Sequence, residues 1–182
     1  GEPIYNLLGG ACHDKIRIYN TIGSYGPYQD NEWEIRDPVG LAQSYIDEGL
    51  TMFKAYYTMS IPHDAQGNYA SARDIKKAME PLAKIRKAVG DQIEIANDGG
   101  GQWSLPSAIR ICKEMEQYDI FWQEEMIRPV NIETHLRLAE AVATPICAAE
   151  RLISKYHFRE FIERGAAEYV MPDLIWTGGI TE

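Results

Sequence analysis

Three acidic residues stand at the ends of three consecutive β-rich runs of the chain. The runs cover residues 93–98, 120–124 and 146–150. Their terminal acids, Asp98, Glu124 and Glu150, follow one another at intervals of 26 residues. One unit of strand, loop, helix and loop has about this length, so the spacing predicts one acid per unit at the same end of a sheet.

These three acids could together bind one divalent cation. Neighbouring parallel strands lie about 4.8 Å apart, so side chains at equivalent positions of three strands can converge on one ion. An all-oxygen set that leaves coordination positions open suits Mg²⁺. Alternatively, each acid caps the following helix or faces solvent. Because Trp122, Ile146 and an alanine pair make these runs look buried, we expect a magnesium site at Asp98, Glu124 and Glu150.

A fourth run, residues 169–173, ends in Asp173, which lies 23 residues after Glu150. Four carboxylates exceed what one Mg²⁺ takes from a protein, so we expect Asp173 to orient or tune a neighbouring base. The alternative is that Asp173 caps the start of the next helix.

Lys54 and Tyr56 have the two-residue spacing that places both on one face of a strand, whereas Phe53, Ala55 and Tyr57 then point to the other face. Burying a lysine inside a barrel costs free energy, so a lysine at such a position is expected to have a function. We expect Lys54 either to contact a carboxylate substrate or, with a pKa lowered by desolvation beside a cation, to act as a base. The alternative is a lysine at a strand end whose ammonium group reaches solvent.

The elements that must position these residues alternate between β-rich and helix-period segments from residue 15 onward. This pattern predicts an α/β fold with a parallel sheet and crossover helices. The expected strands are residues 15–21, 52–57, 93–98, 120–124, 146–150 and 169–173. The expected helices are residues 38–48, 71–89, 105–117, 132–142 and 156–164, with Ser104 as an N-cap and Gly49, Gly90 and Gly165 at C-terminal caps.

The two longest unpatterned inserts, residues 23–36 and 60–69, each follow an expected strand. We expect both as loops at the carboxyl ends of the strands. In barrel enzymes this end carries the active site, so such loops are expected to cover a substrate.

The composition is that of a globular protein with a small-molecule partner. A chain of 182 residues with 45% hydrophobic and 25% charged residues predicts one domain with a sizeable core. The formal net charge of −9 argues against nucleic-acid binding. With no membrane-length apolar run and no signal-peptide pattern, we expect no membrane partner and a cytoplasmic location. Cys12, Cys112 and Cys147 lack metal-ligand spacing and are expected to be reduced and mostly buried.

Through nearly its whole length the sequence resembles the mandelate racemase branch of the enolase superfamily. The matching landmarks are Asp98, the stretch Trp122-Gln123-Glu124-Glu125, the stretch Glu150-Arg151-Leu152, and Asp173 followed by Gly178-Gly179-Ile180-Thr181. The resemblance implies a TIM-type (β/α) barrel in which Asp98, Glu124 and Glu150 hold Mg²⁺. It also implies removal of the α-proton of a carboxylate substrate through an enediolate, and a His on the seventh strand as the partner of Asp173.

Within this family the sequence most resembles those of sugar-acid dehydratases, which expel the β-hydroxyl of an aldonate or aldarate. Its Met171-Pro172-Asp173 and Ser104-Leu105-Pro106 stretches carry this similarity. Tyr56 stands where many members have a second lysine, Met126 where a proline often follows the acid pair, and Gly100 where some dehydratases have His or Asn. These departures favour dehydration over racemisation. A racemase or epimerase that uses Tyr56 or Lys54 as a second base, and a non-catalytic or truncated relative, remain alternatives.

The resemblance also divides the chain. Residues 1–14 are similar to the link that precedes the barrel, and residues 15–182 to a partial barrel with about six of the eight βα units. The capping domain is expected to be absent, and the His partner of Asp173 is expected beyond Glu182. An open sheet has two exposed edges, so we expect the chain to associate, as in a homo-oligomer.

Overall fold

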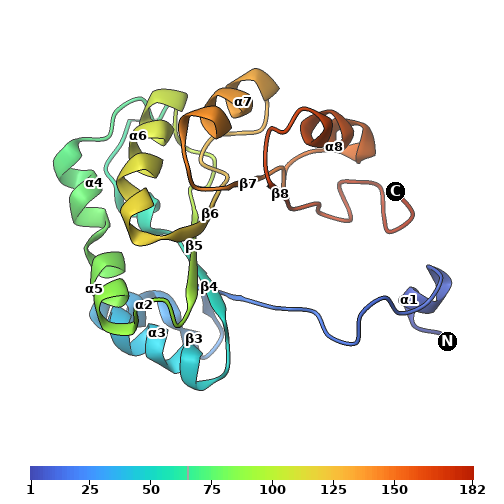
Figure 1. Ribbon diagram of the computed structural model, residues 1–182, viewed down its shortest axis with the longest axis horizontal. Coiled ribbons are helices and arrows are strands. Elements are labelled where there is room, and N and C mark those ends of the chain that lie inside the picture. Colours follow the sequence, from blue (N-terminus) through green and yellow to red (C-terminus); the bar gives the residue numbers. More distant parts are fainter. Residues whose placement is uncertain (65) are drawn as a thin grey trace.

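The central sheet consists of six parallel strands in the order β1-β4-β5-β6-β7-β8 (Figure 1). The computed structural model describes residues 1–64 and 66–182. The strands of the sheet are Asn20–Thr21 (β1), Met52–Ala55 (β4), Glu94–Asp98 (β5), Ile120–Glu124 (β6), Ile146–Ala148 (β7) and Tyr169–Val170 (β8). Strand order follows chain order, as repeated βα units produce. The parallel α/β sheet expected from the sequence is confirmed, and the sheet does not close among the described residues.

Figure 1 shows the helices on the outside of the curved sheet, except the first, which lies apart from the sheet at the end of an extended N-terminal segment. They are Ile4–Leu7 (α1), Asp30–Arg36 (α2), Pro38–Asp47 (α3), Ala72–Ala78 (α4), Glu80–Val89 (α5), Leu105–Met115 (α6), Ile132–Ala141 (α7) and Ser154–Glu163 (α8), with short 3₁₀ turns at Tyr57–Ser60 (η1) and Glu116–Tyr118 (η2). Apolar residues at helical spacing fix which side of each helix faces the sheet. In α6, for example, Ala108, Ile111, Cys112 and Met115 are fully buried.

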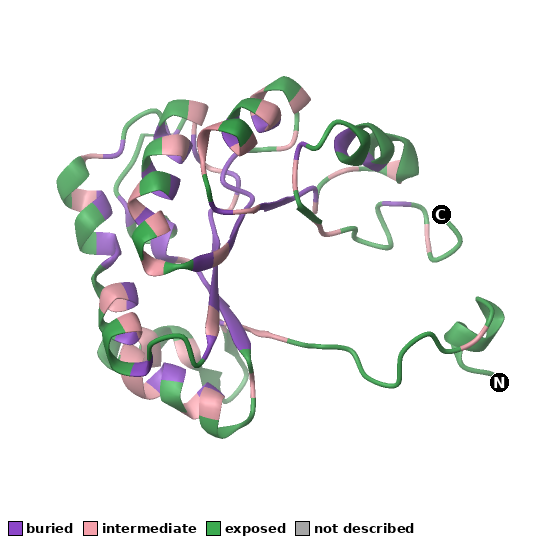
Figure 2. Ribbon diagram, viewed as in Figure 1, coloured by how far each residue is buried: buried purple, intermediate pink, exposed green. Residues whose placement is uncertain are grey.

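The two faces of the sheet carry different residues. Toward the helices, Phe53, Ile95 and their neighbours join one large core with the buried sides of the helices. On the inner face, Met52, Ala96, Trp122 and Cys147 form a second, smaller cluster. Figure 2 shows the buried residues concentrated in the central strands and on the helix sides that face them. The inner face therefore has an apolar layer directly below the carboxyl ends of the strands, where the acids are found.

Polar caps and left-handed glycines set the helix ends. The side chains of Asp37, Ser71 and Asn131 each accept a backbone N–H in the first turn of α3, α4 and α7, which satisfies a donor that the helix itself cannot. Gly90 ends α5 with φ of +60°, a conformation that favours glycine. Ser104 does precede α6, as predicted, but its hydroxyl does not cap that helix. It donates instead to the Gly67 carbonyl, 3.1 Å away.

The single helix predicted for residues 71–89 is divided into α4 and α5 at Met79. Pro81 causes the break, because proline has no N–H to donate and its ring clashes with the carbonyl four residues earlier. Pro81 lies in the first turn of α5, where the missing donor costs nothing.

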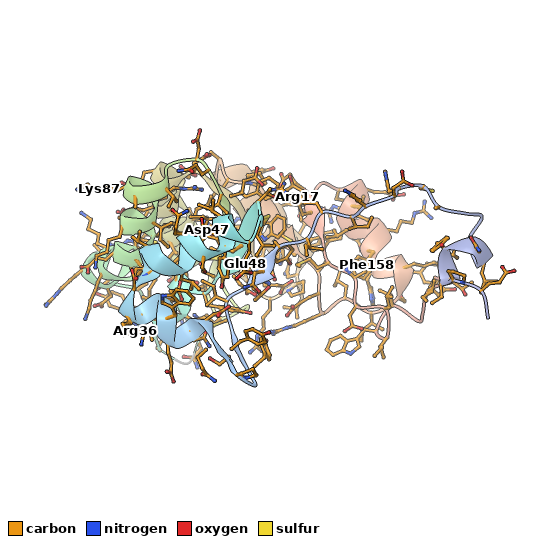
Figure 3. The ribbon with its side chains drawn as sticks, turned by 90° about the horizontal axis from the view of Figure 1, so that it is seen from below. Arg17, Arg36, Asp47, Glu48, Lys87 and Phe158 are labelled. Atoms are coloured by element: carbon orange, nitrogen blue, oxygen red, sulfur yellow. The ribbon has the colours of Figure 1, made fainter. Side chains whose placement is uncertain are left out.

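Several strands are shorter than predicted. Only Asn20 and Thr21 of the run 15–21 pair with β4, and β1 is an edge strand among the described residues. Before it, Arg17 donates to Thr51 Oγ1 at 2.8 Å and forms an ion pair with Glu94, so the segment crosses the start of β4 and β5 and then runs outward to α1 (Figure 3). The strands predicted to end at Tyr57, Glu150 and Asp173 stop at Ala55, Ala148 and Val170.

The insert 23–36, predicted as an unpatterned loop, contains regular structure. Ser24–Tyr25 (β2) and Tyr28–Gln29 (β3) pair as an antiparallel hairpin, and α2 follows directly. Gly26 takes φ of +59° at the first position of the two-residue turn, as such hairpins require. The insert 60–69 packs against the β5–α6 connection through the Gly67 carbonyl, which accepts from Ser104 N at 3.2 Å. Its residue 65 lies outside the described part of the chain.

The three cysteines are free, with Cys112 and Cys147 buried and Cys12 exposed, in agreement with the expected reduced and mostly buried thiols. Within residues 1–64 and 66–182, no helix is both long and apolar enough to cross a bilayer.

Glu34 on α2 provides a test of the packing beside β1. Burial raises the pKa of its carboxyl from about 4.5 to about 7, so the folded protein holds this proton more tightly than the unfolded chain does. The free energy of unfolding should therefore fall as pH rises from about 4.5 to about 7. Glu34→Gln should remove this penalty and add up to about 3 kcal/mol near pH 8. Thermal melts near pH 5 and near pH 8 measure it.

Glu32→Gln, an exposed change on the same helix, is the control and should leave the pH dependence unchanged. Equal pH dependence in the Glu34→Gln variant and the unmodified protein would contradict the assignment.

Candidate metal and substrate site

Lys54 of β4 lies between the carboxylates of Asp98 and Glu124. Its Nζ is 3.1 Å from Asp98 Oδ2 and donates to Glu124 Oε1. Asp98 and Glu124 are directly paired in register at the carboxyl ends of β5 and β6, so both carboxylates lie at one mouth of the sheet. All three residues are buried. Lys54 thus points to the inner face, as the two-residue spacing predicted, while Phe53 and Tyr57 are buried on the helix side.

Hydrogen bonds from the protein hold both carboxylates in place. Trp122 Nε1 donates to Glu124 Oε2 at 3.1 Å, because residues two apart on a strand share a face. The backbone N–H of Gly100 donates to Asp98 Oδ1 at 2.9 Å. Gly100 has φ of +61°, so the chain turns back over the aspartate directly after β5. These contacts fix the oxygen atoms before any ligand binds.

The electrostatics of this group require a cation. Burial, and then the neighbouring charge of Asp98, raise the pKa of Glu124 to about 7 despite the attraction of Lys54. Burial by itself would lower the pKa of Lys54, but the charges of Glu124 and Asp98 outweigh it and raise that pKa. Lys54 is therefore a charged ammonium group in this arrangement. The alternative role of Lys54 as a base beside a metal ion stays a prediction.

Tyr56 lies beside the same group. The Lys54 ammonium is 5.9 Å from the centroid of its ring, close enough for a cation–π contact. Burial, and then the charge of Asp98, raise the pKa of its hydroxyl, so Tyr56 remains protonated at neutral pH and can donate a hydrogen bond. The structure therefore brings together Lys54, Tyr56, Asp98 and Glu124.

Glu150 does not join them in this conformation. Glu124 is paired in register with Cys147, so Glu150 lies three residues beyond the equivalent position and after the end of β7. The expectation that equal sequence intervals place all three acids at equivalent positions is wrong for Glu150, because β7 is offset relative to β6. Its carboxylate, partly exposed, accepts from Arg151 Nε at 3.2 Å. Among residues 1–64 and 66–182, no three acidic, His or Cys side chains are close enough to share an ion.

The side chains nevertheless fit a hard divalent cation. Asp98 and Glu124 already contact one positive group, the Lys54 ammonium, so they can share a cation. Carboxylate oxygens are the ligands that Mg²⁺ prefers. The Glu150–Arg151 pair is exposed on both sides, and such pairs contribute about 0–1 kcal/mol. A side-chain rotation of Glu150 therefore costs little.

Asp173 follows β8 in an exposed loop. Its Oδ1 accepts the backbone N–H groups of Ile175, at 2.8 Å, and Trp176, at 3.3 Å. An Asp side chain often accepts such donors in a turn, and the described residues after Asp173 form a turn and not the helix start of the capping alternative. One carboxylate oxygen makes both contacts. The predicted role of Asp173 in orienting a base stays a prediction.

Two buried polar features near the site were not predicted from the sequence. Asn97 Nδ2 donates to Gln123 Oε1 at 3.0 Å between two fully buried side chains. Each lies one residue before a predicted ligand, and this position was the sequence signal that could have indicated them. Glu125 is also buried and accepts the backbone N–H groups of Ala149 and Glu150. Sequence alone shows it only as the second acid of a pair.

The parallel sheet with acids and a lysine at the carboxyl ends of its strands identifies the class of protein. Residues 38–182 match the enolase C-terminal domain-like family, and the chain belongs to this family. Its six strands are accordingly part of a TIM-type barrel, which confirms the fold and the family predicted from the sequence.

Similar proteins narrow the class further. D-Galactonate dehydratase of Ralstonia pickettii is 32% identical over 100% of this chain and 44% of its own length. The enzyme of the same name from Klebsiella pneumoniae is 32% identical over 99% of this chain and 44% of its own length. An enolase of the mandelate racemase subgroup from Agrobacterium tumefaciens has a TM-score of 0.86 and 36% identity, over 100% of this chain and 46% of that one. The chain spans less than half the length of these relatives.

Proposed function

We propose that this chain forms part of a Mg²⁺-dependent dehydratase that removes the α-proton of a sugar acid and expels its β-hydroxyl. The observation that carries the proposal is the buried group of Lys54, Asp98 and Glu124 at the carboxyl ends of adjacent strands. Two carboxylates that could share a divalent cation, next to a charged lysine, suit a substrate whose own carboxylate must be bound and polarised.

The proposed metal ligands are Asp98, Glu124 and Glu150. When bound, Mg²⁺ would neutralise part of the negative charge of the substrate carboxylate. Lys54 would contact a substrate carboxylate oxygen through its charged ammonium group. Tyr56 would donate a hydrogen bond from its protonated hydroxyl. Asp173 would orient the base, since the unused lone pairs of its carboxylate can accept an imidazole N–H.

A monocarboxylic sugar acid is the proposed substrate class. The names of the two dehydratase relatives specify D-galactonate, and the match with the Ralstonia pickettii enzyme spans this whole chain, including the positions of the proposed ligands. A protein with a formal net charge of −9 needs a local source of positive charge to bind an anion. Lys54 and the proposed Mg²⁺ would provide it.

The proposal predicts Mg²⁺-dependent loss of water from one or more sugar acids. The intact protein is incubated with a panel of aldonates and aldarates, and products are identified by mass spectrometry as 2-keto-3-deoxy acids. Chelation with EDTA should abolish the reaction and added Mg²⁺ should restore it. Running the panel in D₂O separates the alternative: deuterium incorporated at the α-carbon without loss of water would identify a racemase or epimerase. If neither reaction occurs with any of the acid sugars, the proposal is contradicted.

Association of this chain, as in a homo-oligomer, also stays a prediction. Large apolar side chains are exposed near both ends of the chain, among them Ile16 and Ile175. Such residues favour contact with further protein surface.

A further inference from the structure

Glu125 connects the second proposed ligand to the third. It follows Glu124 directly, its side chain is only 1% exposed, and its Oε1 accepts the N–H of Ala149 at 2.6 Å and that of Glu150 at 3.3 Å. Its own N–H donates to the Cys147 carbonyl at 2.9 Å. The residue directly after β6 therefore contacts three consecutive peptide units at the end of β7 and just beyond it.

The segment that Glu125 contacts is strained. Ala149 has φ of +85° and Glu125 itself has φ of +42°. Left-handed backbone at non-glycine residues costs on the order of 1–3 kcal/mol and persists only where the surroundings enforce it. Ala149 is fully buried. The paired N–H groups held by one buried carboxylate are the contact that offsets this strain.

The position of this turn decides where Glu150 lies. Asp98 and Glu124 reach the mouth by strand register alone, but Glu150 comes after the last paired residue of β7, so no ladder hydrogen bond fixes it. The direction of the chain between Ala148 and Glu150 is set by the left-handed turn at Ala149. A ligand presented from such a turn depends on whatever holds the turn.

We propose that Glu125 is a positioning residue, which fixes the backbone of Glu150 relative to Glu124 and so determines whether Glu150 can complete the metal site. The inference rests on the proposed function, since it concerns the affinity for Mg²⁺. Partners that orient a ligand without touching the ion typically contribute about 10- to 100-fold to metal affinity.

Two conservative variants of Glu125 distinguish the effect of side-chain length from that of side-chain charge. Glu125→Gln keeps a carbonyl oxygen at the same distance from the backbone, whereas Glu125→Asp keeps the charge but is shorter by one methylene group and cannot reach both N–H groups. Amide hydrogen exchange at Ala149 and Glu150 and calorimetric Mg²⁺ affinity are measured in the intact protein. Glu125→Gln should retain most of the protection and affinity. Glu125→Asp should lose protection at both amides and bind Mg²⁺ about 10- to 100-fold more weakly.

Glu34→Asp is the matched control, because Glu34 is a buried acid far from this turn along the chain, with a similarly raised pKa of about 7. It should leave both readings unchanged. Glu125→Asp with unaltered exchange, or with lost protection but unaltered Mg²⁺ affinity, would overturn the positioning role. If Glu125→Asp retained the Mg²⁺ affinity and Glu125→Gln lost it, the charge of the side chain would matter and not its length. If the unmodified protein does not bind Mg²⁺, the proposed function itself fails, which is a different result from these.

Discussion

Lys54→Met should destabilise the protein strongly when no divalent cation is present. The change leaves two carboxylates, Asp98 and the almost fully buried Glu124, adjacent to each other without a compensating charge. Removing one partner of a buried ion pair typically costs about 3–5 kcal/mol. The loss should be largest near pH 8 and smaller near pH 5, because a buried carboxyl with a raised pKa takes up a proton as pH falls. Denaturant unfolding at the two pH values measures it.

Mg²⁺ should reverse much of this loss. A ligand that binds only the folded state stabilises it by an amount that grows with the logarithm of its concentration above its Kd, and the vacated position between the carboxylates favours a cation. The melting temperature of Lys54→Met should therefore rise more on addition of Mg²⁺ than that of the unmodified protein. Lys155→Met is the control, since the Lys155–Glu182 pair of 2.9 Å is exposed and should contribute little to stability. A Lys54→Met protein of unchanged stability near pH 8 would contradict the need for a cation here.

Glu124→Gln should abolish turnover while the protein stays folded. Burial disfavours the charged carboxylate at this position, which is the first cause of its raised pKa, so a neutral amide of the same shape is accepted in the fold. Lys54 keeps its contact with Asp98. The amide is, however, a much poorer ligand for Mg²⁺. We expect weaker Mg²⁺ binding and at least about 100-fold lower kcat/KM, since even partners outside the metal's ligands contribute about 10- to 100-fold.

Calorimetry with Mg²⁺ and steady-state kinetics on the sugar acid found in the panel measure this effect. Glu133→Gln, which removes an exposed partner of Arg164, should change neither quantity. Wild-type affinity for Mg²⁺ in the Glu124→Gln protein would remove Glu124 from the proposed ligands, and Asp98 would then need a different partner.

The sequence by itself determined the architecture and the centre of the site. Alternating β-rich and helix-period segments are sufficient to predict a parallel sheet, because only crossover connections join parallel strands. Asp98 and Glu124 could be placed together because both lie at the end of a strand and strand register carries that position across the sheet. Lys54 could be placed on the same face because side chains alternate along a strand. Pro81 was a visible signal for the break between α4 and α5, although the periodicity obscured it.

Only the tertiary structure decided the remaining features of the site. Equal intervals in sequence do not fix the offset between β6 and β7, which leaves Glu150 beyond the paired residues. The left-handed turn at Ala149 depends on a carboxylate that is 24 residues away in the chain. The charge state of Lys54 depends on the balance between burial, which lowers its pKa, and two neighbouring carboxylates, which raise it. Sequence periodicity reports which face a side chain takes, whereas register, backbone strain and electrostatic balance arise from contacts between segments that are distant in the chain.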